Sequence, residues 1–267
     1  MRILFLGDVV GISGCSKLTN NLLQQIDENK IDFVIVNAEN AAEAGVGLTK
    51  EICEDFFNCG VNVITTGNHV WDQKDIMNFI DKENRLLRPK NLFEPAPGKG
   101  FEIYLTKKNI KIGVLNLMGN VFMKKCDDVF SSAKNFLSEF KLKKDYDFLV
   151  VDFHGEITSE KNAIGHFFDG KATLVIGTHT HIPTNDARVL RNGTAYQTDA
   201  GMCGDYESVI GMDKNNSIKR FLKEDSVKHF PAKGEATLSG VIVDCNIENG
   251  LANKIQSYIF GGQLNNN

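Results

Sequence analysis

The 267-residue chain is 42% hydrophobic and 24% charged with a formal net charge of −4, the balance of an ordinary globular protein. This charge excludes a generally basic nucleic-acid-binding or membrane-surface protein, so we expect neither nucleic acid nor membrane as a stable partner. The first apolar stretch is too short for a signal peptide, and none reaches the roughly 18 residues of a spanning helix, so we expect a cytoplasmic location.

The first half of the chain alternates short apolar runs with segments of helical periodicity. Strands are expected at residues 3–6, 33–36 and 61–64, and helices at 17–28, 49–58 and 74–80. Thr49 is the expected N-cap of the second helix. This alternation is typical of a parallel sheet with right-handed crossovers.

A loop rich in proline, residues 89–100, precedes the second half of the chain. We expect strands at 101–105, 110–117, 146–153, 172–176, 194–198, 238–247 and 251–260, and helices at 131–140 and 162–168. Residues 201–211 are predicted as a glycine-rich loop that could serve as a lid, and 261–267 as a flexible tail. We therefore expect one α/β domain over 1–267, with more antiparallel strands late in the chain.

Five of the expected strands end in residues that can bind metal or transfer protons. These residues are Asp8; Glu39 and Asn40; Asn68 and His69; His154; and His179 with His181. Sites in open α/β sheets lie outside the carboxyl ends of the strands, so the set would meet at one edge. Each residue alone has an ordinary alternative: Asp8 as a helix cap, Asn40 in a turn, His154 in the core. Asp199 and Asp213 are expected to cap or line the site without binding metal.

The candidate ligands mix oxygen and nitrogen without a thiolate. The six cysteines are scattered with no Cys-x-x-Cys pair, so we expect them to be reduced packing residues. An oxygen–nitrogen set suits Fe, Mn, Zn or Mg and argues against a cysteine-rich zinc cage. The set is large enough for two ions, and it would leave the site net positive and attractive to phosphate. Paired ions are common in phosphatases and nucleases.

Taken in order, these motifs resemble those of calcineurin-like metallophosphoesterases, and within them the bacterial branch of 2′,3′-cyclic-nucleotide phosphodiesterases. The matching segments are residues 7–8, 37–40, 67–72, 152–161, 177–181 and 201–213. The likeness runs from residue 1 to about 260. Val10 stands where the wider superfamily has a histidine, and Glu39 stands where it has a bridging aspartate. Both departures are features of the bacterial branch.

The resemblance implies a four-layer αββα sandwich with its site at the carboxyl ends of the strands in mixed sheets. It also implies two metal ions, iron first, with Mn, Mg or Zn left open. The first ion would be held by Asp8, Glu39, Asn40 and His181, and the second by Glu39, Asn68, His154 and His179, with Glu39 bridging. The implied reaction is hydrolysis of a 2′,3′-cyclic nucleotide, 2′,3′-cyclic AMP first, by a metal-bridging hydroxide, with His69 as proton donor.

Two other functions remain open from the sequence. One is a phosphomonoesterase or protein phosphatase on the same metals, and the other is a nucleotide-sensing module without turnover. The complete ligand set and the acid His69 argue against a pure binder. Asp72 could orient His69, but its position before the helix at 74–80 favours an N-cap. The sequence leaves a homo-oligomer open.

Overall fold

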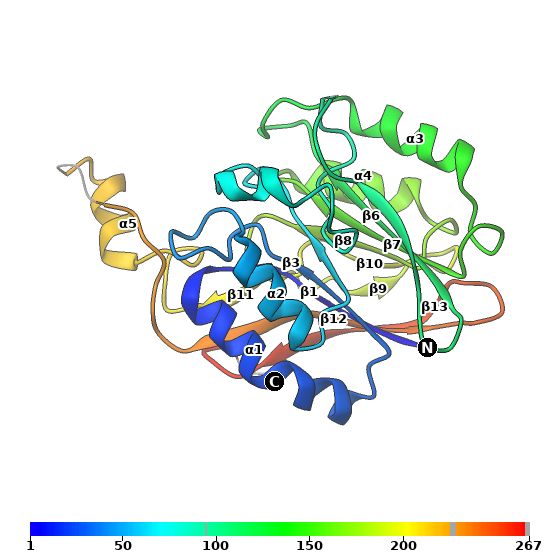
Figure 1. The fold of residues 1–267 in the computed structure, drawn as a ribbon, viewed down its shortest axis with the longest axis horizontal. Helices are drawn as coiled ribbons and strands as arrows, with labels where there is room; N and C mark the ends of the chain where they lie inside the picture. The colour runs from blue at the N-terminus through cyan, green and yellow to red at the C-terminus, as the bar shows by residue number, and fades with distance from the viewer. Residues whose placement is uncertain (94, 225–227, 265–267) are drawn as a thin grey trace.

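The computed structural model describes residues 1–93, 95–224 and 228–264, and most of its strands form two facing sheets (Figure 1). The first sheet contains β1 (Arg2–Leu6), β2 (Asp8–Val9), β3 (Phe33–Asn37), β4 (Val63–Thr65), β11 (Met202–Asp205), β12 (Ala236–Cys245) and β13 (Ala252–Phe260). The second contains β5 (Phe101–Leu105), β6 (Lys111–Met118), β7 (Phe148–His154), β8 (Leu174–Thr178), β9 (Arg188–Val189) and β10 (Ala195–Gln197). The helices are α1 (Gly11–Asn29), α2 (Lys50–Asn58), α3 (Val129–Glu139), α4 (Thr158–Phe167) and α5 (Lys214–Phe221), with a 3-10 helix η1 (Lys74–Asn78).

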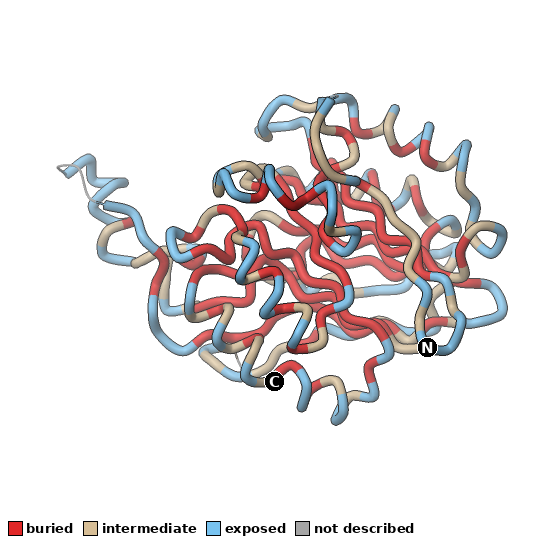
Figure 2. The backbone as a smooth tube through the Cα atoms, in the orientation of Figure 1, coloured by how far each residue is buried: buried red, intermediate tan, exposed pale blue. Residues whose placement is uncertain are grey.

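Three apolar clusters separate the layers. One fills the space between the sheets, with Phe5 from β1 and Val150 from β7 among its members. A second joins the outer face of the first sheet to α1 and α2, and a third joins the outer face of the second sheet to α3 and α4. Side chains alternate between the two faces of each strand, so each sheet contributes to two clusters. Figure 2 shows the buried strands and the exposed outer faces of the helices. The expected αββα sandwich is confirmed.

The strand pairing agrees with most of the sequence prediction. β1, β3 and β4 are parallel, while β12 and β13 are antiparallel to their neighbours. In the second sheet β6, β7, β8 and β10 are parallel, and the edge strands β5 and β9 are antiparallel. The late strand β10 is thus parallel, against the expected trend. Thr49 caps α2 and Asp213 caps α5, as expected.

Helix α1 begins six residues earlier than predicted, because two glycines interrupt its apolar periodicity. One of them, Gly14, allows the helix to approach β11 closely. A Cβ at Gly14 would lie 2.2 Å from the carbonyl oxygen of Cys203. Helix α4 likewise begins at Thr158, four residues before the predicted start.

The prediction of a glycine-rich loop at residues 201–211 is wrong for the first half of that range. Residues 202–205 form the buried strand β11, which pairs with β12 on one side and β2 on the other. A strand held from both sides cannot serve as a lid.

The six cysteines are all free. Within the described ranges, no helix is long and apolar enough to cross a membrane. Of the predicted tail, residues 265–267 lie outside the described residues.

Candidate metal centre

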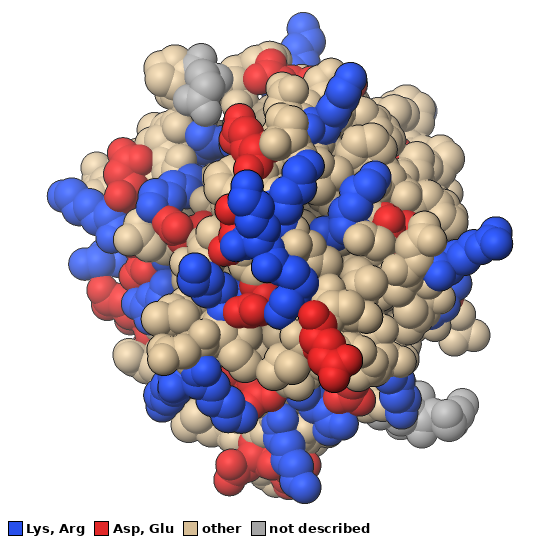
Figure 3. All heavy atoms as spheres, turned by 90° about the vertical axis from the view of Figure 1, so that its right-hand side faces the viewer, with Lys and Arg blue, Asp and Glu red and all other residues tan. Residues whose placement is uncertain are grey.

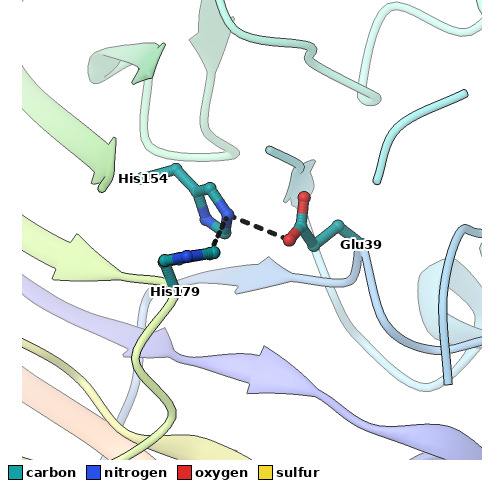
Figure 4. Close-up of side chains that lie close together, drawn as sticks. All are labelled: Glu39, His154 and His179. Carbon is teal, nitrogen blue, oxygen red and sulfur yellow. Dashed lines mark hydrogen bonds and ion pairs between the residues drawn. The ribbon is translucent and has the colours of Figure 1, made fainter. Parts of the chain in front are cut away.

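The predicted ligands lie at the edge of the sandwich where parallel strands of both sheets end. From the first sheet, Asp8 follows β1, Glu39 and Asn40 follow β3, and Asn68 follows β4; from the second, His154 ends β7, and His179 and His181 follow β8. Asp8, Glu39 and His154 are at most 1% exposed. Figure 4 shows the side chains of Glu39, His154 and His179 pointing toward one another.

Thr178 and Asp152 determine which nitrogen of His154 carries a proton. The Oγ1 of Thr178 lies 2.7 Å from Asp152 Oδ1 and 2.9 Å from His154 Nδ1. Asp152 also accepts hydrogen bonds from Thr65 and Asn37, and burial raises its pKa to about 6, so it is largely ionised at neutral pH. The threonine hydroxyl therefore donates to Asp152 and accepts from the Nδ1–H of His154. This arrangement turns Nε2 of His154, with its lone pair, toward the site.

The other two histidines are oriented in the same manner. Nε2 of His179 lies 3.1 Å from Glu156 Oε2, and Nδ1 of His181 lies 2.8 Å from the carbonyl oxygen of Ile210. Both partners accept hydrogen bonds, so these two nitrogens carry the protons. Burial, together with repulsion from His154, lowers the pKa of His179 to about 3, so its ring is neutral. His179 thus presents Nδ1, and His181 presents Nε2, with a free lone pair.

Three atoms suited to bind a cation surround Nε2 of His154, which could bind the same ion. Nε2 of His154 lies 2.9 Å from Glu39 Oε1, 3.0 Å from Asn68 Oδ1 and 3.1 Å from His179 Nδ1. One ligand atom each from Glu39, His154 and His179 lies within 4.8 Å of the other two. Ligand atoms this close need a positive charge among them, which is either a proton on Nε2 of His154 or a metal ion in its place. The mixed oxygen and nitrogen set fits the ions expected from the sequence.

Four buried side-chain oxygens lack a hydrogen-bond partner among the residues that the structure describes, and two of them, Asp8 Oδ1 and Asn40 Oδ1, belong to the predicted ligands. Asp8 Oδ1 lies 3.8 Å from His181 Nε2, which is too far for a hydrogen bond. The second oxygen of Asp8 accepts the backbone N–H of His179 at 3.1 Å. A buried polar atom without a partner is costly, so these two oxygens also fit a cation.

The electrostatics of the buried carboxylates favour positive charge at the same place. Burial would raise the pKa of Glu39, but the facing His154 outweighs it and lowers that pKa to about 2. Burial would lower the pKa of His154, but Glu39 outweighs it and raises that pKa to about 9, so without metal Nε2 carries a proton that donates to Glu39, and a bound ion would replace this proton. Burial raises the pKa of Asp8 in spite of two nearby histidines. These shifts indicate that the pocket stabilises a cation between its carboxylates and its imidazoles.

His69 lies beside this cluster and is held at two points. Its backbone N–H donates to Glu39 Oε2 at 3.0 Å, and its Nδ1 lies 2.6 Å from Asp72 Oδ2. The favoured interpretation of Asp72 as an N-cap is wrong, because η1 is preceded by Gln73 and has no side-chain cap. Asp72 contacts the ring of His69 instead. Nζ of Lys124, which lies in another loop, is 3.4 Å from Asp72 Oδ1.

Sequence reasoning missed the residues that orient the ligands. Thr178 and Glu156 contact the ring nitrogens of the candidate ligands His154 and His179, and Asp152 holds Thr178. Asp152 and Glu156 both lie in the matching segment 152–161 and Thr178 lies in 177–181, so the motifs contained the signal. Their roles depend on neighbouring strands, which the motifs do not reveal.

Comparison with known proteins shows the family to which the chain belongs. The model of a family described as YmdB-like protein matches residues 4–258. The chain is 43% identical over 256 residues to a 2′,3′-cyclic-nucleotide 2′-phosphodiesterase of Bacillus subtilis, with 96% of each protein covered.

Two similar crystal structures cover almost the whole chain. One, of a hypothetical protein from Thermus thermophilus, has 36% identity and a TM-score of 0.89, with 97% of this chain and 99% of that chain covered. The other, described as a novel phosphatase from Mycoplasma pneumoniae, has 37% identity and a TM-score of 0.90, with 97% and 93% covered. The expected resemblance to the bacterial phosphodiesterase branch is confirmed, and with it the expectation of a phosphoesterase-type enzyme. The chain belongs to the YmdB-like protein family.

Proposed function

We propose that this protein hydrolyses 2′,3′-cyclic nucleotides, 2′,3′-cyclic AMP first, at a site that holds two metal ions. The observation that carries the proposal is the convergence of lone pairs from Glu39, Asn68, His154 and His179 on one point, beside two unpaired buried oxygens. The relative from Bacillus subtilis bears the name of this activity, which supports the choice of substrate.

The side chains would be shared between the ions as the resemblance implies. Asp8, Glu39, Asn40 and His181 would hold one ion, and Glu39, Asn68, His154 and His179 the other. When bound, such ions supply an activated water and neutralise the oxygens of a phosphate. Iron is the first candidate, and manganese is the second, because both accept oxygen and nitrogen ligands.

His69 is the residue that this chain offers as general acid. Its Nδ1 faces Asp72 Oδ2 at 2.6 Å, so the carboxylate orients the ring. The Nε2–H is then free to protonate the ribose oxygen that leaves when the cyclic ester opens. If the bond to O2′ breaks, as the name of the relative indicates, the product is the nucleoside 3′-phosphate.

Attraction of the anionic substrate must come from the site itself. Lys and Arg side chains do gather on one face, interspersed with Asp and Glu (Figure 3). That face is the right-hand side of Figure 1, where the amino end of β1 lies, away from the carboxyl ends that form the site. The whole chain carries a net charge of −4. Bound metal is therefore the feature that would favour a phosphate.

The first experiment is turnover of 2′,3′-cyclic AMP by protein supplied with Mn²⁺ or Fe²⁺. Glu39→Gln keeps the shape of the side chain but removes the bridging charge, so we expect loss of both activity and bound metal. Asp169→Asn is the matched control, because Asp169 also accepts backbone N–H groups but lies after α4, at the other end of the strands. Full activity in Glu39→Gln would refute the mechanism.

A substrate panel separates the proposed function from the alternatives. We expect turnover of cyclic nucleotides and of bis-p-nitrophenyl phosphate, and weaker turnover of p-nitrophenyl phosphate and phosphopeptides. Preference for the monoesters would favour a phosphatase on the same metals. Nucleotide binding without metal-dependent product would favour the sensing module.

A further inference from the structure

A buried ion pair beneath the two metal-binding histidines has no role in the proposed reaction. Lys161 of α4 and Asp199, which follows β10, are separated by 2.6 Å between Nζ and Oδ2. Their side chains are 1% and 0% exposed. Isolated charges are rarely buried in proteins, because desolvation is costly unless they are paired and hydrogen-bonded. The pair therefore requires a structural or functional reason.

The carboxylate of Asp199 holds the residue between the two histidines. Its Oδ2 accepts the backbone N–H of Thr180 at 3.1 Å and the hydroxyl of Thr180 at 2.6 Å. Its Oδ1 accepts the backbone N–H of Gly201 at 2.8 Å. Together with Lys161, these groups donate all the hydrogen bonds that the carboxylate of Asp199 accepts.

The turn that Asp199 holds has an unfavourable backbone. His179 has φ of 97° and His181 has φ of 66°, in the left-handed region that residues with a Cβ rarely adopt. Such a conformation persists only where neighbouring groups impose it. Thr180 lies between them, and its N–H and hydroxyl are both bound by Asp199. Asp199 thus holds the backbone between the two imidazoles, in addition to the contacts that each ring makes itself.

The side chain of Lys161 fits beside β8 because residue 177 is a glycine. Gly177 precedes the turn, and a Cβ there would lie 3.1 Å from Cδ of Lys161 and 1.8 Å from the carbonyl oxygen of Thr198. The missing side chain lets the stem of Lys161 pass along β8 to reach Asp199. Lys161 and Gly177 both belong to the matching motifs, although neither is a candidate ligand.

We propose that Lys161 and Asp199 are positioning residues of the metal centre. Lys161 pairs with the carboxylate of Asp199, and Asp199 holds Thr180 so that His179 and His181 face the metals in their left-handed conformation. The inference rests on the proposed function, because it takes these histidines as ligands. It adds that metal affinity depends on a charge pair that touches neither metal nor substrate.

The test measures Mn²⁺ affinity by titration calorimetry of the full chain, with thermal unfolding in EDTA as a separate readout. Lys161→Met leaves a buried charge unpaired and is expected to lower the melting temperature strongly. The double variant Lys161→Met, Asp199→Asn removes both charges, so we expect its melting temperature to recover. Its Mn²⁺ affinity should remain about 10–100-fold below that of the wild type, the usual effect of losing an outer-shell partner.

Two further results belong to the same prediction. Excess Mn²⁺ should restore kcat of the double variant, because the reacting groups are intact. The double variant Arg2→Met, Asp244→Asn removes a half-exposed ion pair elsewhere and should leave Mn²⁺ affinity unchanged. A Lys161, Asp199 double variant with wild-type stability and Mn²⁺ affinity within twofold of wild type would overturn the proposal.

Thr180 provides a test that does not require the ion pair to be removed. Thr180→Val loses the hydroxyl that donates to Asp199, while Thr180→Ser keeps it. We expect weaker Mn²⁺ binding in the first and wild-type binding in the second, and equal affinities would again overturn the inference. If the wild-type protein itself binds no Mn²⁺, the proposed function is wrong. If the wild type binds Mn²⁺ but these variants bind it equally well, only the role of Lys161 and Asp199 is wrong.

Discussion

Thr178→Val tests the orientation of His154 without removing any of the proposed ligands. Valine has nearly the shape of threonine, so no cavity forms, but Nδ1–H of His154 loses its acceptor and Asp152 loses a donor. A buried group left unpaired costs about 1–3 kcal/mol of stability. Nothing then holds the proton on Nδ1, and a proton on Nε2 would compete directly with metal.

The expected effect on metal binding follows from the same contact. Removing an outer-shell partner of a ligand histidine costs about 10–100-fold in affinity, or roughly 1.4–2.8 kcal/mol. Calorimetric titration with Mn²⁺ measures this change directly, and urea unfolding in EDTA measures the stability of the same protein. We expect both quantities to fall in Thr178→Val.

Thr173→Val is the matched control on the same stretch of chain. Thr173 is equally buried and also makes two hydrogen bonds, to the N–H of Leu149 and the carbonyl oxygen of Gly250. It precedes β8, at the end remote from the site. We expect a similar loss of stability and unchanged Mn²⁺ affinity. Equal Mn²⁺ affinity in Thr178→Val and wild type would refute the tautomer assigned to His154.

Three other predictions follow from single contacts. Asp72→Asn should lower kcat for 2′,3′-cyclic AMP about 10–100-fold with metal content unchanged, because His69 loses its anionic partner; an unaltered kcat would exclude this role. Gly67→Ala should lower the melting temperature and the metal content, because the new Cβ would lie 2.2 Å from Cδ2 of His154; a metal-replete variant would contradict the packing. Burial would raise the pKa of Asp186, but hydrogen bonds to its carboxylate outweigh burial and lower that pKa in the folded protein. Asp186 therefore stabilises the fold at pH values above its pKa in the unfolded chain, and this stability is lost as the pH falls through its pKa in the folded protein. Urea unfolding of Asp186→Asn and wild type should therefore differ at pH 7, and the difference should shrink as the pH falls through the lowered pKa of Asp186.

The elements and the candidate ligands could be predicted because both leave local patterns. Apolar runs such as 33–36 and 172–176 are short and bounded by polar residues, and each appears in the structure as a strand with shifted limits. The first turn of α1 could not be predicted, because it contains Gly11 and Gly14, and glycine has a low helix propensity. Gly14 is required there because the helix packs closely against β11. Strand β11 was missed because its residues, Met202–Asp205, lie between glycines and are stabilised by pairing on both sides.

By itself, the sequence determined the four-layer class of fold, the family and the chemical types that gather at the carboxyl ends of the strands. These depend on periodicity and on the order of motifs along the chain, which a linear sequence displays. Only the tertiary structure decided that Thr178 and Asp152 set the tautomer of His154, and that Asp199 holds the turn between His179 and His181. Those roles depend on hydrogen bonds of 2.6–3.1 Å between separate strands and loops, and such contacts exist only after the chain has packed.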